Sequence, residues 1–220
     1  MPLQPGDYVT ERGWGTLAIT RDKSGALKFS LEAMGGNAHS CSLDGEIRNG
    51  RATLEALDKG KPCVVTFTAK ADGITVDSVD GVICRYFCGM RAMFEGQYLK
   101  PAPGCAPAQV SATRKEFKSL YDRKDYAAAR AKLESAFTSC AKTIDWLDTG
   151  WIRNDLALAQ LRSGDAAACL RTLEPLAKDA ARSDAQIRDE MVSPTDVDNW
   201  LPVIHAARTI LKLCSSAPKK

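Results

Sequence analysis

Cysteine is the residue type in this sequence that most clearly points to specific chemistry, either disulfide formation or metal binding. The chain contains eight cysteines: Cys41, Cys63, Cys84, Cys88, Cys105, Cys140, Cys169 and Cys214. This number is typical of a disulfide framework, whose connectivity cannot be read from the spacing. A tetrahedral zinc site is one alternative, because His39, Cys41 and the Cys84-x3-Cys88 pair offer one imidazole and three thiolates; free buried thiols are another. His39 and Cys41 have a strand spacing, so we expect disulfides, no metal and no cofactor.

The cysteines divide unevenly along the chain, with five before residue 106 and three after it. If all eight pair within the chain, at least one disulfide must join the two halves. Cys105 lies in a stretch rich in proline, alanine and glycine, and we expect it to make this bond with Cys214. Closing so long a loop would restrict the unfolded chain and hold the halves in a fixed relation.

Motifs of common catalytic mechanisms do not occur in this sequence. It has no Gly-x-Ser-x-Gly elbow, no Gly-x4-Gly-Lys phosphate loop and no His-Glu-x-x-His helix. Cys84 and Cys88 are too far apart for a thioredoxin-like redox pair. The two histidines, His39 and His205, are expected to be structural. We therefore predict that the protein is not an enzyme.

Charge and hydropathy exclude two kinds of partner. The net charge is +3, with 45% hydrophobic and 26% charged residues, the balance of a soluble globular protein. Basic residues form no run except Lys219-Lys220, so we expect no nucleic-acid binding. The longest apolar stretches have the length of strands, so we expect no membrane span.

Residues 8–79 alternate between apolar and polar side chains, which predicts antiparallel strands. Turn residues at 22–25, at Asn49-Gly50 and at 71–73 divide them into three hairpins, and Asn-Gly is the strongest hairpin signal. The strand after Asn49-Gly50 is predicted to run from Ala52 to Leu57. About six strands would form a small barrel or a sandwich, and we favour the barrel.

Beyond Pro107 the apolar periodicity becomes helical. Residues 124–133 (KDYAAARAKL) match residues 164–173 (GDAAACLRTL) at an offset of 40. These helical hairpins resemble tetratricopeptide repeats, with an insertion near residues 143–149. A last helix is expected from Asp198 to Leu213. The predicted fold is α+β with two domains: a barrel at 6–100, a proline-rich linker at 101–108 and a helical domain at 109–214.

The segment from Cys84 to Tyr98 is the densest in aromatic, sulfur and arginine side chains. Arginine and tyrosine are enriched at the energetic centres of protein interfaces. The residues predicted to contact a protein partner are Arg85, Tyr86, Arg91 and Tyr98. The apolar residues predicted to plug the barrel are Phe87, Met93 and Phe94.

The chain start bears on the cellular compartment. Met1 stands directly before a lead-in with proline and glycine, which we interpret as a start placed where a signal peptide was removed; a natural cytosolic start is the alternative. Eight cysteines favour an oxidising compartment. We therefore predict a periplasmic or secreted protein.

A family resemblance rests on Asn37-x-His39-x-Cys41-x-Leu43-x-Gly45, Cys63, Cys84-x3-Cys88-Gly89 and Phe94-x-Gly96-x-Tyr98. Over residues 6–105 this pattern resembles a small β-domain of proteobacterial envelope proteins, and loosely the disulfide-bonded barrels of periplasmic lysozyme inhibitors. With a helical-repeat half added, the architecture is similar to periplasmic immunity proteins that neutralise type VI secretion effectors, some of them phospholipases.

The resemblance implies a non-enzymatic immunity protein or inhibitor. Its partner would be a toxin or an envelope-active enzyme, either a phospholipase or a peptidoglycan hydrolase. The alternative is an envelope scaffold or assembly factor whose helical-repeat domain binds peptides.

Overall fold

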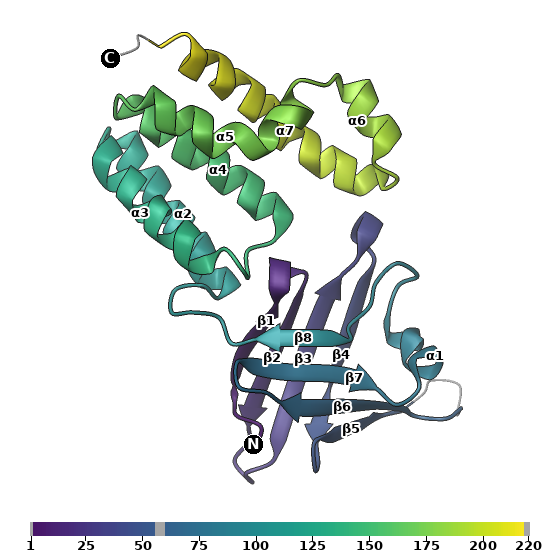
Figure 1. Ribbon diagram of the computed structural model, residues 1–220. Coiled ribbons are helices and arrows are strands. Elements are labelled where there is room, and N and C mark those ends of the chain that lie inside the picture. The colour runs from purple at the N-terminus through teal and green to yellow at the C-terminus, as the bar shows by residue number, and fades with distance from the viewer. Residues whose placement is uncertain (1, 56–59, 218–220) are drawn as a thin grey trace. The chain divides into compact units, whose positions relative to one another are not determined.

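The chain forms two compact units in the computed structural model, Met1–Ala106 and Pro107–Lys220 (Figure 1). The structure describes residues 2–55 and 60–217. The first unit is built on a β-sheet and the second on helices, so the fold mixes α and β as predicted. The predicted domain bounds, 6–100 and 109–214, stay predictions.

The strands of the first unit form one antiparallel sheet, in the order β4-β3-β2-β1-β8-β7-β6-β5. Their bounds are β1 (Gly6–Thr10), β2 (Gly15–Arg21), β3 (Leu27–Met34), β4 (Ser40–Ile47), β5 (Arg51–Leu54), β6 (Cys63–Ala69), β7 (Gly73–Ser78) and β8 (Gly96–Leu99). The described residues thus contain eight strands, where about six were predicted. The two strands that were not predicted, β1 and β8, are short. They pair with each other although they lie far apart in the sequence, and a local sequence pattern does not reveal such a pairing.

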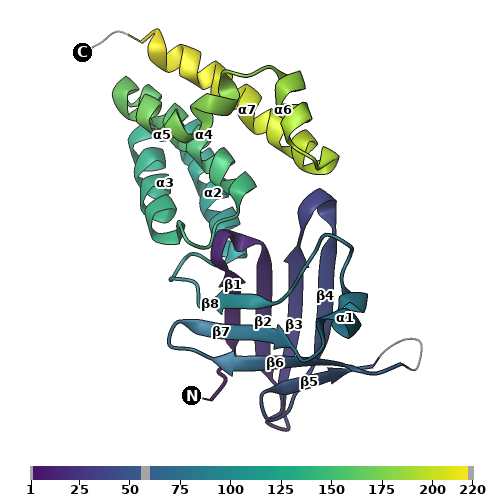
Figure 2. The same ribbon diagram turned by 45° about the vertical axis from the view of Figure 1, so that its right-hand side comes forward.

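The sheet curls towards a barrel (Figure 2). Its two edge strands, β4 and β5, are consecutive in the chain, and Arg48 and Arg51 exchange backbone hydrogen bonds of 2.7 and 3.0 Å between them. The turn residues Asn49 and Gly50 both have left-handed backbone, with φ of 51° and 73°. A two-residue hairpin of this kind matches the twist of its strands. The expected return strand ends at Leu54, and its predicted end at Leu57 lies outside the described residues.

Side chains alternate between the core and the solvent along the strands, as the period of two requires. On β3, Phe29, Leu31 and Ala33 are buried while the residues between them are exposed. Phe29 packs on Phe67 of β6 with ring centroids 4.9 Å apart. The predicted hairpins therefore supply the core of the first unit.

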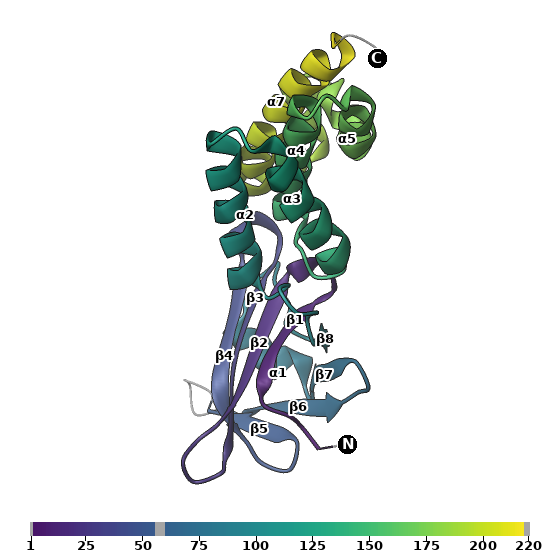
Figure 3. The ribbon, with the colours of Figure 1, turned by 90° about the vertical axis from the view of Figure 1, so that its left-hand side faces the viewer.

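Helices make up the second unit, and most neighbours in the chain pack side by side (Figure 3). Their bounds are α2 (Pro107–Asp122), α3 (Tyr126–Cys140), α4 (Trp146–Arg162), α5 (Ala166–Ala180), α6 (Asp184–Glu190) and α7 (Pro194–Ser215), while the short α1 (Gly81–Cys84) belongs to the first unit. The predicted last helix lies within α7, and α2 begins inside the predicted linker. None of the described helices combines the length and apolar character that a membrane crossing requires.

The repeat at an offset of 40 is visible in how two helices begin. The Asp125 side chain accepts a hydrogen bond of 3.2 Å from the Ala128 N–H at the start of α3. The Asp165 side chain accepts one of 2.9 Å from the Ala168 N–H at the start of α5. Aspartate is a favoured residue at this position because it satisfies an N–H that the helix leaves unpaired.

Disulfides join Cys41 to Cys88, Cys63 to Cys84 and Cys169 to Cys214. Cys105 and Cys140 are also disulfide-bonded, and none of the described cysteines is free. The predicted bond between Cys105 and Cys214 is wrong. Cys169 of α5 and Cys214 of α7 are both buried where these helices pack together, so they pair with each other. That a disulfide joins the two halves stays a prediction.

The zinc alternative is excluded by the same bonds. Its three sulfur ligands, Cys41, Cys84 and Cys88, all lie in disulfides and have no thiolate to offer. Cys84 and Cys88 also bond to different partners and not to each other.

Candidate functional site

Residues 79–93, which we call the 79–93 segment, make up most of the connection between β7 and β8. The Asp80 carboxylate accepts hydrogen bonds from the Val82 and Ile83 N–H groups at 3.0 and 3.3 Å, and so begins α1. A single 3-10 turn follows at Arg85–Phe87. The segment is therefore a compact irregular loop with its own local hydrogen bonds.

Both disulfides of the β-sheet end on this segment. Cys84 is bonded to Cys63 at the start of β6, and Cys88 is bonded to Cys41 of β4. Next to the second bond, the Gly89 N–H donates to the Ser40 carbonyl oxygen at 2.8 Å. The backbone of the segment is thus attached to two strands, which limits its conformational freedom before any partner binds.

The β3–β4 turn makes a further attachment. Gly35 lies so close to the segment that a Cβ placed there would be 2.0 Å from the Arg91 carbonyl oxygen. Met34, the preceding residue, has a half-exposed side chain. The turn and the segment therefore form one continuous surface.

Three of the four predicted contact residues are exposed on this segment: Arg85, Tyr86 and Arg91. The guanidinium of Arg85 donates a hydrogen bond to the Met90 carbonyl oxygen, which folds the segment back on itself. The ring of Tyr86 stacks edge-on against Phe87, with centroids 5.8 Å apart. The structure therefore brings these residues together on one loop.

Tyr98, the fourth predicted residue, does not belong to this surface. It is fully buried, and its hydroxyl donates to the Phe94 carbonyl oxygen at 2.8 Å. Burial raises the pKa of its phenol. Its position in β8 places the ring in the core, beside Trp14, so it cannot contact a partner in this structure.

Apart from Tyr86, the exposure of the large apolar side chains on the 79–93 segment is the main feature that sequence reasoning missed. Five of them have exposed fractions between 58% and 86%: Val79, Val82, Tyr86, Met90 and Met93. Of the residues predicted to plug the barrel, Phe94 is buried and Phe87 packs on the core, but the prediction for Met93 is wrong. The sequence signal that could have revealed this exposure is that the apolar residues of the segment follow neither the period of a strand nor that of a helix.

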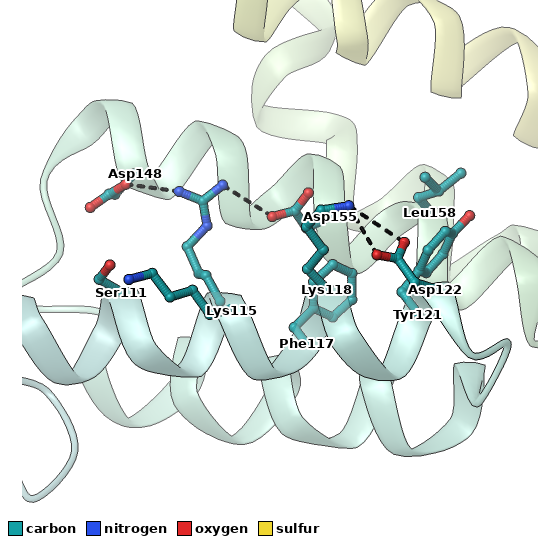
Figure 4. Close-up of a pocket in the computed structure, with 10 residues that line it drawn as sticks. Ser111, Lys115, Phe117, Lys118, Tyr121, Asp122, Asp148, Asp155 and Leu158 are labelled. Carbon is teal, nitrogen blue, oxygen red and sulfur yellow. Dashed lines mark hydrogen bonds and ion pairs between the residues drawn. The ribbon is translucent and has the colours of Figure 1, made fainter.

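A groove in the helical unit is the second candidate site (Figure 4). It lies between α2 and α4 and has a volume of about 490 Å³. Its lining residues are Ser111, Arg114, Lys115, Phe117, Lys118, Tyr121, Asp122, Asp148, Asp155 and Leu158.

One arginine joins the two walls of this groove. The Arg114 guanidinium donates to Asp148 and to Asp155, each at 3.1 Å. Burial raises the pKa of both aspartates, although Arg114 opposes the shift, and the nearby Asp145 raises the pKa of Asp148 further. The two carboxylates thus share a single arginine as their ion-pair partner.

No protein-family model, curated protein or solved structure matches this chain. The function must therefore be argued from the two sites themselves.

Both histidine rings contact other side chains or backbone of the protein. The Nε2 atom of His205 lies 2.8 Å from Asp184, which Arg208 also contacts, so the three side chains link α6 to α7. The His39 ring lies against Gly89 of the 79–93 segment. Among the described residues, no three histidine, cysteine or acidic side chains are grouped to hold a metal ion.

Proposed function

We propose that the protein is a non-enzymatic inhibitor or immunity protein that binds an envelope-active enzyme or toxin through the 79–93 segment. The observation that carries this proposal is the concentration of exposed apolar side chains on a loop attached by two disulfides. A phospholipase or a peptidoglycan hydrolase is the expected class of partner.

Exposed apolar side chains on neighbouring residues favour burial against another protein. Aromatic residues, methionine and arginine are enriched at protein interfaces, and the segment presents Tyr86, Met90, Met93, Arg85 and Arg91. Attachment by Cys84 and Cys88 reduces the conformational entropy that binding would otherwise cost. These features together support a binding surface.

The disulfides also support the compartment. Disulfides persist in oxidising environments such as the periplasm and the extracellular space. A protein that neutralises an enzyme of the envelope would act in such a compartment.

Affinity capture from periplasmic extract, followed by an activity assay on the captured enzyme, tests the proposal. Tyr86→Ala should weaken the complex at least ~30-fold, because truncation at the centre of an interface costs about 2 kcal/mol or more. Arg85→Ala should weaken it as well, whereas Lys23→Ala, at the exposed β2–β3 turn, should leave it unchanged. A captured enzyme that retains full activity, or binding unaffected by Tyr86→Ala and Arg85→Ala, would contradict the proposal.

An envelope scaffold or assembly factor is the second candidate function. The groove between α2 and α4 favours it, because a cavity of this size suits part of a peptide. A scaffold would capture several proteins without inhibiting any enzyme, and capture would depend on groove residues such as Asp155 and not on Tyr86.

A further inference from the structure

We propose that the groove between α2 and α4 binds an extended segment of a partner polypeptide in which a lysine or arginine stands next to an apolar residue. This inference deepens the second candidate function by naming the chemistry of its ligand. It does not depend on the 79–93 segment.

The shape of the groove suits an extended chain. Its lining residues on α2 run from Ser111 to Asp122, which corresponds to about 16 Å along a helix. An extended polypeptide advances about 3.3 Å per residue, so about five residues match this length. The ends of the lining on α4, Asp148 and Leu158, are nearly as far apart in sequence.

One part of the groove is apolar. Phe117 is buried, and its ring lies 5.9 Å from that of Tyr121. Leu158 of α4 lines the same end (Figure 4). These side chains offer a place for an apolar residue of the ligand.

The lining as a whole is balanced in charge, with three cations and three carboxylates, but the inner part formed by Asp148, Asp155 and Arg114 is negative. Asp148 and Asp155 contribute two negative charges, and Arg114 between them contributes one positive charge. Lys118 also acts on Asp155, but it forms an ion pair of 3.1 Å with Asp122, so that pair is neutral together. A cation of the ligand placed beside Asp148 and Asp155 would complete their neutralisation.

An anionic ligand is less well matched. Arg114 already donates to both aspartates, so an anion would have to compete with them for its N–H groups. Among the lining side chains that the structure describes, Lys115 is the cation without a carboxylate partner. Lys115 is exposed, and water and salt screen its charge. Charge complementarity therefore favours a basic ligand.

Binding of three blocked pentapeptides to the 220-residue chain, measured by calorimetry, tests this inference. The peptides are acetyl-Ala-Lys-Phe-Ala-Ala-amide and its analogues with norleucine or glutamate in place of lysine. We expect the lysine peptide to bind at least ~10-fold more tightly than the norleucine peptide, and the glutamate peptide to bind most weakly. Equal binding of the three peptides, tighter binding of the glutamate peptide, or no binding of the lysine peptide at millimolar concentration would overturn the proposal.

Substitutions locate the site. Asp148→Asn and Asp155→Asn should each remove most of the preference for lysine, while Asp122→Asn should keep it, because Asp122 is paired with Lys118. Thermal unfolding establishes that each variant is folded. A lysine preference that survives both Asp148→Asn and Asp155→Asn would contradict the assigned site.

Two further measurements separate this inference from its rivals. Phenethylamine that binds as tightly as the lysine peptide would show a site for a small amine and would overturn the polypeptide ligand. Tyr86→Ala should bind the lysine peptide as the unmodified protein does. Loss of enzyme inhibition with intact peptide binding would thus contradict the function of the 79–93 segment alone, and the reverse result would contradict the groove alone.

Discussion

Lys124 and Gly164 occupy the same place in two helical hairpins, and both have left-handed backbone, with φ of 64° and 83°. The Lys124 N–H donates to the Tyr121 carbonyl oxygen and the Gly164 N–H to the Leu161 carbonyl oxygen, both at 2.9 Å. Glycine adopts this conformation freely, whereas a residue with a Cβ pays about 1 kcal/mol. The first hairpin therefore contains strain that the second avoids.

Replacing Lys124 by glycine is expected to stabilise the protein by about 0.5 kcal/mol or more, because it relieves this strain. Gly164→Ala is expected to destabilise it by about 1 kcal/mol for the opposite reason. Urea unfolding monitored by circular dichroism measures both changes. A destabilising Lys124→Gly would show that the lysine side chain makes a contribution larger than the strain.

Gly35→Ala is expected to disturb the 79–93 segment. The new Cβ would lie 2.0 Å from the Arg91 carbonyl oxygen, a backbone atom, so the β3–β4 turn or the segment must move. We expect a loss of stability of about 1–3 kcal/mol, typical of overpacking. Gly81→Ala is the matched control, since its Cβ has its nearest neighbour at 3.5 Å. Chemical denaturation of both variants tests this, and equal stabilities would contradict the close approach.

Removal of the disulfides should have unequal effects. The Cys41–Cys88 bond spans 47 residues and the Cys63–Cys84 bond spans 21. Chain entropy predicts losses of about 4 kcal/mol for Cys41→Ala with Cys88→Ala, and about 3 kcal/mol for Cys63→Ala with Cys84→Ala. Unfolding free energies of the two double variants test the order, and a larger loss for the shorter loop would contradict the entropic account.

Peptide mapping without reductant is expected to find Cys169 linked to Cys214. Both sulfurs belong to buried residues of packed helices, so exchange with other cysteines should be slow. A peptide that links Cys214 to Cys105 would contradict the structure of the helical unit.

Acid should weaken the contact between α6 and α7. Hydrogen bonds from Arg208, and then from His205, lower the pKa of Asp184. The stability that this lowering represents is present above the ordinary aspartate pKa of about 3.9 and is lost as the pH falls through the lower folded value. We expect Asp184→Asn to be less stable than the unmodified protein at pH 6, with a smaller difference near pH 2. Asp189→Asn, an exposed change on the same helix, is the control, and urea midpoints at both pH values give the comparison.

Local signals in the sequence predicted the parts of the fold that depend on neighbouring residues. Asn49-Gly50 predicted a hairpin because few other pairs adopt two successive left-handed conformations. The match of residues 124–133 to residues 164–173 predicted two similar helical hairpins, and in the structure Asp125 and Asp165 both bond to N–H groups only three residues away. Apolar alternation in β3 predicted a strand because side chains on a strand point to opposite faces.

The sequence by itself determined the β-sheet followed by helices, the main hairpins and the oxidised cysteines. Only the tertiary structure decided that Cys214 pairs with Cys169, that Tyr98 is buried and that Met93 is exposed. The same holds for Arg114, which contacts aspartates 34 and 41 residues away in the chain. These outcomes depend on which distant elements pack together, and the physical reason is that burial and side-chain pairing are set by the whole fold, whereas turns and caps are set by a few adjacent residues.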